Sequence, residues 1–260
     1  MSKHLIRVLN LGKRSFDDVL RTQEVLRQRV IAQNSISHQR SLFPFTNDVR
    51  GDGYPGEPEN FLILVEHWPV YTAGLRDKAF SQEDANKLKA LGAEVYRTNR
   101  GGLATFHGPG QLVAYPILNL KAMGFGLKEY VARLEHTLVQ TCAAVGVSAK
   151  TTDETGVWVD DRKIGSIGVN AKRYVTLHGV ALNCSVDLSW FDHITPCGLE
   201  GVEMTSLSKE TGEEINVSET ERHFLSSFSK VFETSPSSVS DYVPAAIADA
   251  KNTPMNARVF

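Results

Sequence analysis

Cys197, one of three cysteines in the chain, lies in the heptapeptide that runs from Thr195 to Gly201. Pro196 restricts the backbone before the thiol, and Gly198 allows a sharp turn after it. A thiol on such a turn can face a cleft with backbone N–H groups close enough to stabilise a developing oxyanion. A lone cysteine is more often a small buried hydrophobe. The segment alone therefore leaves a nucleophile and a core residue both open.

A second candidate for chemistry is the segment from Arg100 to Gln111, which holds four glycines and one proline in twelve residues. Glycine lets a backbone approach a ligand closely and leaves its N–H groups free to bind it. The pattern is neither a P-loop nor a dinucleotide fingerprint. A tight hairpin would also use glycine, but it would not need His107 between so many of them. We therefore expect this loop to bind a ligand.

Lys163 stands near the start of an expected strand and is followed by Gly165, Ser166 and Gly168. Glycines weaken a strand unless something packs closely against its backbone. A ligand chain lying over these small residues would explain them and would leave Lys163 beside the ligand. A neighbouring cation lowers the pKa of a thiol. The sequence thus predicts that Lys163 activates Cys197.

The histidines do not predict a metal site. His67, His107, His178 and His193 show no recognised spacing of metal ligands. We therefore expect no bound metal. His178 is followed by Gly179, which repeats the combination of histidine and glycine seen in the loop above.

Composition limits the class of protein. At 260 residues and 42% hydrophobic content, the chain can bury one substantial core. A net charge of −2 argues against a general nucleic-acid surface. Three cysteines without paired spacing argue against a disulfide framework. No apolar run reaches the roughly 20 residues that would span a bilayer, so we expect no membrane segment.

Strands and helices are predicted to mix without regular alternation, which favours an α+β fold with a mixed sheet flanked by helices. Strands are expected over 4–9, 61–65, 111–118, 157–159, 163–169 and 174–183. Helices are expected from Ser15 to about 33, from Ser81 to Gly92, over 127–145, and from a capping box that starts at Ser218. We expect one catalytic domain over 1–235, with a loop insertion over 34–60 and a disordered tail over 236–260.

Four segments, three of which contain the candidate residues above, carry a resemblance to a known family. They read RGGLATFHGPGQLVAYPIL over 100–118, GVWVDDRKIGSIGV over 156–169, LHGVALN over 177–183 and ITPCGLEG over 194–201. Together with EHWPVYTAG over 66–74, they resemble the lipoyl(octanoyl) transferases of lipoate biosynthesis, the LipB-type octanoyltransferases. The resemblance runs from about Leu5 to Phe232. It implies the fold of the biotin/lipoate protein ligase superfamily.

The resemblance also implies roles for individual residues. Cys197 looks like the nucleophile that carries the acyl thioester, and Lys163 looks like the residue that activates it. The segments expected to line the acyl pocket comprise Arg100, Gly101, Gly102, Leu103, Ala104, Thr105, Phe106 and His107, then Ser166, Ile167 and Gly168, then Gly179, Val180 and Ala181. Phe106 stands where the family often has tyrosine, and Gly165 and Ser166 replace a pair that is often alanine.

The implied activity is transfer of an octanoyl group from octanoyl-acyl carrier protein, through a cysteine thioester, to a lysine of a lipoyl-domain protein. The expected acceptors are the glycine-cleavage H protein and the E2 subunits of 2-oxoacid dehydrogenases. Exchange between thioesters is close to thermoneutral, so we expect no ATP, no metal and no other cofactor. Two alternatives stay open: an ATP-dependent lipoate or biotin protein ligase, and a non-catalytic module that binds lipoyl domains.

The expected partners are acyl carrier protein and lipoyl-domain acceptors, with no nucleic acid and no membrane, and we expect a monomer. The insertion and the tail resemble those of eukaryotic relatives, which implies a mitochondrial location. A cytoplasmic bacterial enzyme is the alternative. The N-terminus carries Lys3, Arg7, Lys13 and Arg14 without an acid before Asp17, as transit peptides do. We favour a first strand there instead.

Overall fold

The structure is a computed structural model, and it describes residues 4–42, 59–195, 201–238 and 258–259. The elements in chain order are β1 (His4–Arg14), α1 (Phe16–Leu42), β2 (Asn60–His67), β3 (Val70–Ala73), α2 (Gln82–Ala90), β4 (Glu94–Arg97), β5 (Thr105–His107), β6 (Gln111–Ile117), α3 (Leu120–Met123), α4 (Leu127–Ala144), β7 (Val157–Val159), β8 (Arg162–Lys172), β9 (Val175–Asn183), the 3₁₀-helix η1 (Leu188–His193), α5 (Leu207–Thr211), α6 (Val217–Val231), β10 (Thr234–Ser238) and β11 (Arg258–Val259).

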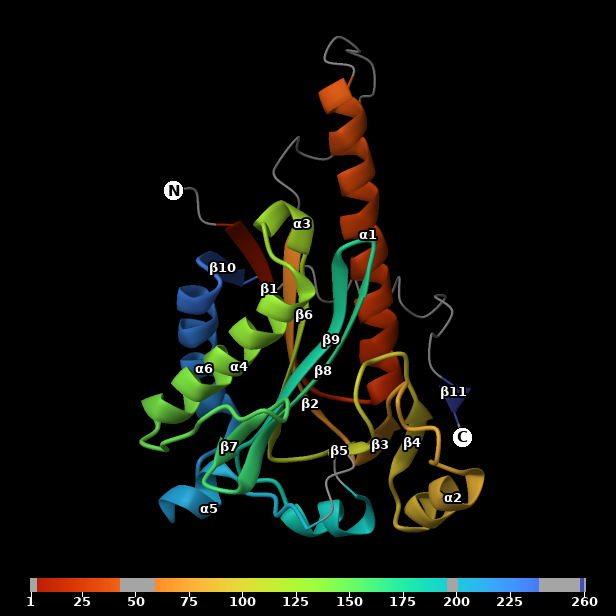
Figure 1. Ribbon diagram of the computed structural model, residues 1–260, viewed down its shortest axis with the longest axis vertical. Helices are drawn as coiled ribbons and strands as arrows, with labels where there is room; N and C mark the ends of the chain where they lie inside the picture. Colours follow the sequence, from red (N-terminus) through yellow and green to blue (C-terminus); the bar gives the residue numbers. More distant parts are fainter. Residues whose placement is uncertain (1–3, 43–58, 196–200, 239–257, 260) are drawn as a thin grey trace.

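The larger sheet has seven strands in the order β10-β1-β2-β6-β9-β8-β7 (Figure 1). Strands β10, β1 and β2 run parallel to one another, and every pairing from β2 to β7 is antiparallel. The sheet is therefore mixed, as the irregular order of strands and helices predicts. The expected α+β class is confirmed.

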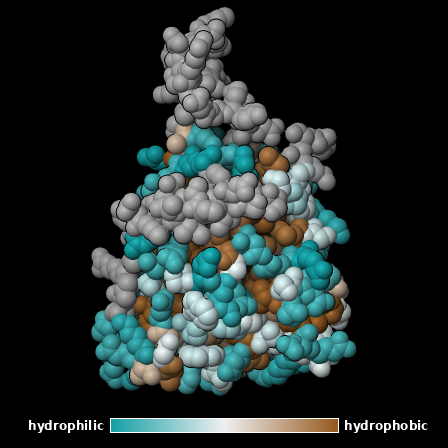
Figure 2. Space-filling view, turned by 180° about the vertical axis from the view of Figure 1, so that it is seen from behind, coloured by the Kyte–Doolittle hydropathy of each residue, from teal (hydrophilic) through white to brown (hydrophobic). Residues whose placement is uncertain are grey.

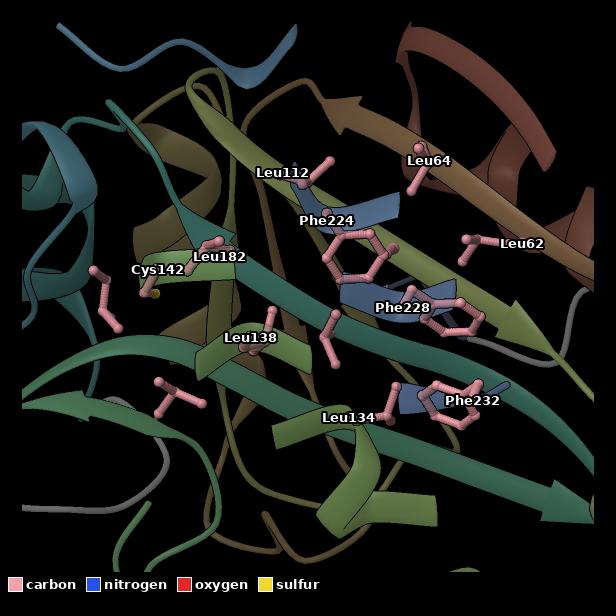
Figure 3. Close-up of a cluster of buried hydrophobic side chains, with 14 of the residues drawn as sticks. Leu62, Leu64, Leu112, Leu134, Leu138, Cys142, Leu182, Phe224, Phe228 and Phe232 are labelled. Atoms are coloured by element: carbon pink, nitrogen blue, oxygen red, sulfur yellow. The ribbon is translucent and has the colours of Figure 1, made fainter. Parts of the chain in front are cut away.

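Helices cover both faces of this sheet, so its central strands are buried on both sides. Phe61, Ile63 and Val65 of β2 pack in a cluster with α1, whereas Leu62 and Leu64 pack in the cluster of the opposite face. That second cluster is drawn in Figure 3, where side chains of α4 and α6 meet the sheet. The helical residues labelled there are Leu134, Leu138, Cys142, Phe224 and Phe228. The continuous apolar run in β2 follows from burial on two faces.

A smaller sheet, in the order β11-β4-β3-β5, packs beside the larger one. Its core contains Tyr71 of β3 and Phe106 of β5, together with Phe191 of η1. The Phe106 ring stacks on Trp190 with 5.1 Å between centroids and 3° between planes. Strand β5 thereby turns Phe106 towards η1. Its neighbours Thr105 and His107 point to the other side, as alternation along a strand requires.

Helix α1 is longer than the sequence pattern indicates. The apolar periodicity ends near residue 33, but the helix continues to Leu42. No glycine or proline occurs in this helix, and the first proline beyond it is Pro44. A nucleated helix extends at little cost until a breaker ends it. Residues 34–42 of the expected loop insertion are therefore helical, and residues 43–58 lie outside the described residues.

The expectation of a disordered tail over 236–260 is wrong where the structure describes the tail. Pro236 and Ser237 belong to β10, which pairs in parallel with β1, and β11 pairs with β4. Strand β10 is an edge strand, where proline is tolerated because no neighbour needs its missing N–H group. An edge strand with serine and proline shows no apolar periodicity, which explains why the pattern missed it. Residues 239–257 and 260 lie outside the described part of the chain.

Among the described residues, the exposed large hydrophobic side chains are spread along the chain. They are Leu5 of β1, Leu127 of α4, and Trp68, Leu75, Leu91 and Tyr174 in connecting segments. Figure 2 shows the back of the molecule, where hydrophilic and hydrophobic residues alternate over the part that is not grey. Among the helices of the described residues, none is long and apolar enough to cross a membrane.

Candidate active site

A pocket lies between strands β8 and β9 of the larger sheet and the segment that joins β4 to β5. Its lining consists of Phe16, Arg100, Gly102, Leu103, Thr105, His107, Val113, Tyr115, Ser166, Ile167, Gly168, His178, Gly179, Val180 and Ala181. The structure thus brings all three predicted pocket segments to one place. Of the predicted residues, Gly101, Ala104 and Phe106 do not line the pocket. Phe106 belongs to the core of the smaller sheet instead.

The glycines of β8 serve two different faces of the strand. A Cβ atom at Gly168 would lie 2.9 Å from Cδ of Arg100, so the loop that covers the pocket rests directly on this glycine. The N–H group of Gly101 donates to the carbonyl of Val169 at 2.9 Å and fixes that contact. Gly165 differs, because its Cβ would lie 2.9 Å from Leu138 of α4. The expectation that a ligand lies over Gly165 is therefore wrong, since α4 occupies that side.

Arg100 holds the loop in shape from within. Its side chain is buried, and its guanidinium donates to the carbonyl of Leu103 at 2.9 Å and to the hydroxyl of Thr72 at 2.9 Å. It also donates to the carbonyl of Thr72 at 2.5 Å and to that of Gly101 at 2.9 Å. The charge-assisted bonds to Gly101 and Leu103 restrict the backbone of the loop, and those to Thr72 tie it to β3. Arg100 therefore braces the wall of the pocket.

A second set of polar contacts fixes the loop from the side of β8 and β9. His178 bonds through Nε2 to Oδ1 of Asn99 at 2.9 Å, and Asn170 donates to the carbonyl of Asn99 at 2.9 Å. His178 has a φ of 59°, a left-handed conformation that histidine adopts more readily than most residues. Its N–H group donates to the side chain of Gln23 on α1 at 2.8 Å. The loop is thus anchored to both strands and to α1.

The buried histidines at the pocket are neutral near pH 7. Burial lowers the pKa of His107 to about 3 and that of His178 to about 3. Nδ1 of His107 lies 2.7 Å from Oε1 of Gln111, whose amide nitrogen donates elsewhere, so Nδ1 carries the proton. His67 behaves alike: burial lowers its pKa to about 4, and its Nε2 accepts from the hydroxyl of Tyr115 at 2.9 Å. The inner part of the pocket therefore carries no histidine charge.

The side chain of Lys163 is buried, with 1% of the residue exposed. Its ammonium group donates to the carbonyl of Thr155 at 3.0 Å and lies 5.1 Å from the ring centroid of Trp158. The backbone of Lys163 is bonded to Glu203 at 2.8 Å and to Thr205 at 2.9 Å. The chain that follows Cys197 thus runs along the start of β8, three residues before the pocket residue Ser166.

Cys197 lies outside the described residues, so the structure gives no geometry for its thiol. The other two cysteines are buried in the core. Burial raises the pKa of Cys142 to about 12 and that of Cys184 to about 11. Both are therefore protonated thiols near neutral pH, and neither has the properties of a nucleophile. Among the described residues, no group of three or more His, Cys, Asp or Glu is arranged to hold a metal ion.

Comparison with known proteins assigns the family. Residues 50–229 match the family described as the lipoyl protein ligase A/B catalytic domain. The chain belongs to this family. It is 42% identical over 236 residues to the mitochondrial octanoyl-acyl-carrier-protein:protein N-octanoyltransferase LIPT2 of Homo sapiens, covering 89% of this chain and 95% of the relative. The corresponding protein of Danio rerio is 41% identical over 233 residues, covering 89% and 94%.

A solved structure of lipoate-protein ligase A bound with ATP superimposes with a TM-score of 0.67 at 13% identity, covering 97% of this chain and 95% of that one. At this identity the likeness concerns the fold alone. It confirms the ligase-type fold that the sequence predicts for this chain. Proteins named as transferases and proteins named as ligases therefore share one fold. Only the residues of the site can distinguish acyl transfer from ATP-dependent ligation.

Four pocket residues were not predicted from the sequence: Phe16, Val113, Tyr115 and His178. Val113 and Tyr115 alternate on β6, so the period-2 pattern could have placed them on one face. The sequence pattern singles out His178 for its glycine neighbour and as a rejected metal ligand, but does not place it in the pocket. Phe16 begins α1, far away in the sequence, and no local pattern connects it to β8 or β9.

Proposed function

We propose that this member of the lipoyl protein ligase A/B family is a mitochondrial acyltransferase. It takes an octanoyl group from octanoyl-acyl carrier protein and transfers it to a lysine of a lipoyl-domain protein, the first step of protein lipoylation. Relatives at 41% and 42% identity, named as mitochondrial octanoyltransferases, support the reaction and the location. The glycine-cleavage H protein and the E2 subunits of 2-oxoacid dehydrogenases are the proposed acceptors.

One observation supports the chemistry most directly: a buried lysine stands on the strand that also lines the pocket. Lys163 lies on β8, and Ser166, Ile167 and Gly168 of the same strand form part of the pocket wall. The segment after Cys197 is bonded to the backbone of Lys163 through Glu203 and Thr205. A cation held in low dielectric stabilises a nearby thiolate more than it would in water. Lys163 is thus suited to activate the thiol of Cys197.

In the first step, the thiolate of Cys197 attacks the carbonyl carbon of the octanoyl thioester. The bond between that carbon and the phosphopantetheine sulfur breaks, and the departing thiolate takes up a proton. The enzyme then carries the octanoyl group as a thioester on Cys197. One thioester replaces another, so the step needs neither ATP nor a metal. The alkyl chain occupies the pocket between β8, β9 and the Arg100 loop.

In the second step, the ε-amine of the acceptor lysine attacks the same carbonyl carbon. The carbon–sulfur bond to Cys197 breaks and an amide forms. The attacking amine has an ordinary pKa near 10.4, so it must lose protons on the way to the amide. Lys163 is the proposed acceptor of one proton, because it gives its own proton to the departing phosphopantetheine thiolate in the first step and is then neutral; the other proton passes to the released cysteine thiolate. Transfer through a covalent enzyme predicts ping-pong kinetics.

ATP dependence separates this proposal from its nearest alternative, a ligase on the same fold. Purified protein is incubated with octanoyl-acyl carrier protein and glycine-cleavage H protein, and octanoylation of the acceptor lysine is followed by mass spectrometry. We expect full transfer without ATP, and no transfer from free octanoate with ATP. Transfer that requires free acid and ATP would identify a ligase. Absence of transfer under both conditions, with acceptor bound, would identify a non-catalytic binding module.

The protein works as a monomer that meets acyl carrier protein and the lipoyl domain in turn, without nucleic acid or membrane. Size-exclusion chromatography with light scattering tests the monomer. A mass near 28.7 kDa is expected, and twice that mass would contradict it.

A further inference from the structure

The ring of Phe16, the first residue of α1, forms part of the pocket wall. Phe16 lines the pocket although only 2% of the residue is exposed. Its ring centroid lies 5.6 Å from that of His67 and 5.1 Å from that of Tyr96. It packs in a small cluster with Leu20, Val70, Tyr96 and Leu177. A ring held on several sides cannot turn away when a ligand presses on it.

The strand pairing gives the direction of the pocket. Ser166 of β8 pairs with Ala181 of β9, and Ala181 pairs with Val113 of β6, so three lining residues form one row across the sheet. The next strand in that row is β2, where Val65 pairs with Val113 and the ring of His67 packs against Phe16. Phe16 therefore stands at the β2 side of the pocket, whereas Lys163 is on β8 at the opposite side.

The width between these sides suits a medium acyl chain. From β8 across β9 to β6 is two strand spacings, roughly 10 Å. An extended eight-carbon chain, with bonds of ordinary length, is roughly 9 Å long. A chain that starts on the β8 side and crosses β9 and β6 therefore ends close to Phe16. Each further pair of methylenes has to displace the ring or the groups behind it.

The surroundings of Phe16 suit the methyl end of such a chain. His67, which packs against the ring, and Tyr115, which lines the pocket, direct their polar atoms at each other. His67 and His107 stay neutral because burial lowers their pKa values. Val113 adds an aliphatic surface to the lining. Arg100, the charged residue of the lining, has its guanidinium bonded to Thr72, Gly101 and Leu103. The side of the pocket at Phe16 thus offers mainly carbon surface, which favours a hydrocarbon terminus.

We infer that Phe16 is the residue that limits the length of the acyl chain this enzyme accepts. The inference rests on the proposed function, in which the pocket holds the acyl chain. The ring of Phe16 meets the terminal methyl group of an octanoyl chain and excludes chains that are two or more methylenes longer. Hydrophobic pockets discriminate by about tenfold or more for one methylene.

Competition between acyl donors tests the inference. Octanoyl-, decanoyl- and dodecanoyl-acyl carrier protein are mixed in equal amounts with enzyme, and the masses of the products on glycine-cleavage H protein are compared. In Phe16→Leu and Phe16→Ala, the ratio of decanoyl to octanoyl transfer is expected to rise roughly tenfold over that of the unchanged enzyme. Phe16→Leu keeps an apolar side chain and retains folding if the alanine variant does not.

Leu20→Ala is the matched control. Leu20 is on the same helix and in the same cluster as Phe16, but it does not line the pocket. Its substitution loosens the packing without lengthening the pocket, so the ratio is expected to stay unchanged. An unchanged ratio in folded Phe16→Leu overturns the inference. So does an equal rise in Leu20→Ala, because general loosening would then explain it.

Failure of the inference is distinguishable from failure of the proposed function. Each variant is also incubated with octanoyl-acyl carrier protein alone, and the octanoyl group on Cys197 is measured. An adduct in every variant with an unchanged length ratio rejects only the role of Phe16. Absence of any adduct in the unchanged enzyme rejects the proposed thioester, and with it the basis of the inference.

Discussion

Gly156 leaves the space that the side chain of Lys163 fills. A Cβ atom at Gly156 would lie 2.6 Å from Cε and 3.1 Å from Nζ of Lys163. Gly156 also has a φ of 134°, and its N–H group donates to Glu135 at 3.0 Å. The proposed activating lysine is thus held by a glycine that precedes β7 and by the carbonyl of the residue before that glycine, Thr155.

Gly156→Ala is therefore expected to displace Lys163 and to slow acylation of Cys197. The methyl group conflicts with Cε of Lys163, and it would lie 2.8 Å from the carbonyl oxygen of Gly165. Single-turnover acylation by octanoyl-acyl carrier protein measures the effect, which we expect to exceed tenfold. Gly146→Ala is the control, because Gly146 also has a positive φ but has no atom within 4 Å of its Cβ position. Equal rates in the two variants would contradict the proposed role of Gly156.

Lys163→Met tests the charge of the lysine separately from its volume. Methionine has a similar length and suits a buried site, so the fold is expected to survive. Loss of the cation raises the pKa of the Cys197 thiol, and alkylation of Cys197 by iodoacetamide at pH 7 should slow roughly tenfold or more. Lys163→Arg restores the charge but lacks room beside Gly156, so it should restore only part of the rate. Identical pH–rate profiles for alkylation in the three proteins would refute the activating role.

Two glycines of β8 should respond differently to the same substitution. Gly168→Ala pushes against Arg100 and the loop over the pocket, whereas Gly165→Ala pushes against Leu138 of α4. Gly168→Ala should raise KM for octanoyl-acyl carrier protein several-fold. Gly165→Ala should chiefly lower the free energy of unfolding, by about 1–3 kcal/mol for an overpacked core. Urea unfolding and steady-state kinetics on both variants check this. A greater loss of donor binding in Gly165→Ala would contradict the assignment of faces.

Stability should fall as the pH falls below about 6.5. His67, His107 and His178 are neutral in the folded protein because burial lowers their pKa values to about 4, 3 and 3. The unfolded chain takes up these protons from about pH 6.5 downwards, while the folded protein does not until about pH 4. The stabilisation is thus full above pH 6.5 and declines below it by up to ~1.4 kcal/mol per pH unit for each histidine.

Urea unfolding at pH 7.5, 6.0 and 5.0 measures the slope of the free energy of unfolding against pH. His67→Gln should make the slope shallower by the contribution of one histidine, because glutamine does not titrate in this range. The variant is expected to be less stable at pH 7.5, since Tyr115 loses its partner. A slope equal to that of the unchanged protein would contradict the linkage to His67.

Much of the fold could be predicted because its pattern is local. The run from Phe61 to Val65 indicates a strand buried on both faces, and the capping box of Ser81 with Asp84 marks the start of α2. The start of α6 shows the limit of such signals. Ser218 was expected to cap it, but Asn216 is the N-cap and accepts from the N–H group of Glu219. Asparagine and serine are both favoured N-cap residues, so the sequence alone does not show which of the two caps the helix. The hydrogen-bond geometry of the folded chain decides it.

Glycine content predicts the loop from Arg100 and the small residues of β8 as ligand-binding, and the rest of the candidate site could be predicted only from the resemblance to the family. Period-2 alternation would have removed Phe106 from the pocket, because Thr105 and His107 on either side of it line the pocket. The place of the Phe16 ring in the pocket wall depends on how α1 packs across the sheet, which no local pattern encodes. The role of Gly156, which precedes β7, likewise depends on contact with the side chain of Lys163 on β8.

The covalent intermediate tests the central claim most directly. Enzyme is mixed with octanoyl-acyl carrier protein, without ATP or acceptor, and its intact mass is measured. We predict a gain of one octanoyl group on Cys197 that hydroxylamine removes, that glycine-cleavage H protein discharges, and that survives in Cys142→Ala and Cys184→Ala but not in Cys197→Ala. If Cys197→Ala transfers octanoyl groups at the full rate, the thioester mechanism is wrong, and the acceptor lysine attacks the acyl carrier thioester directly.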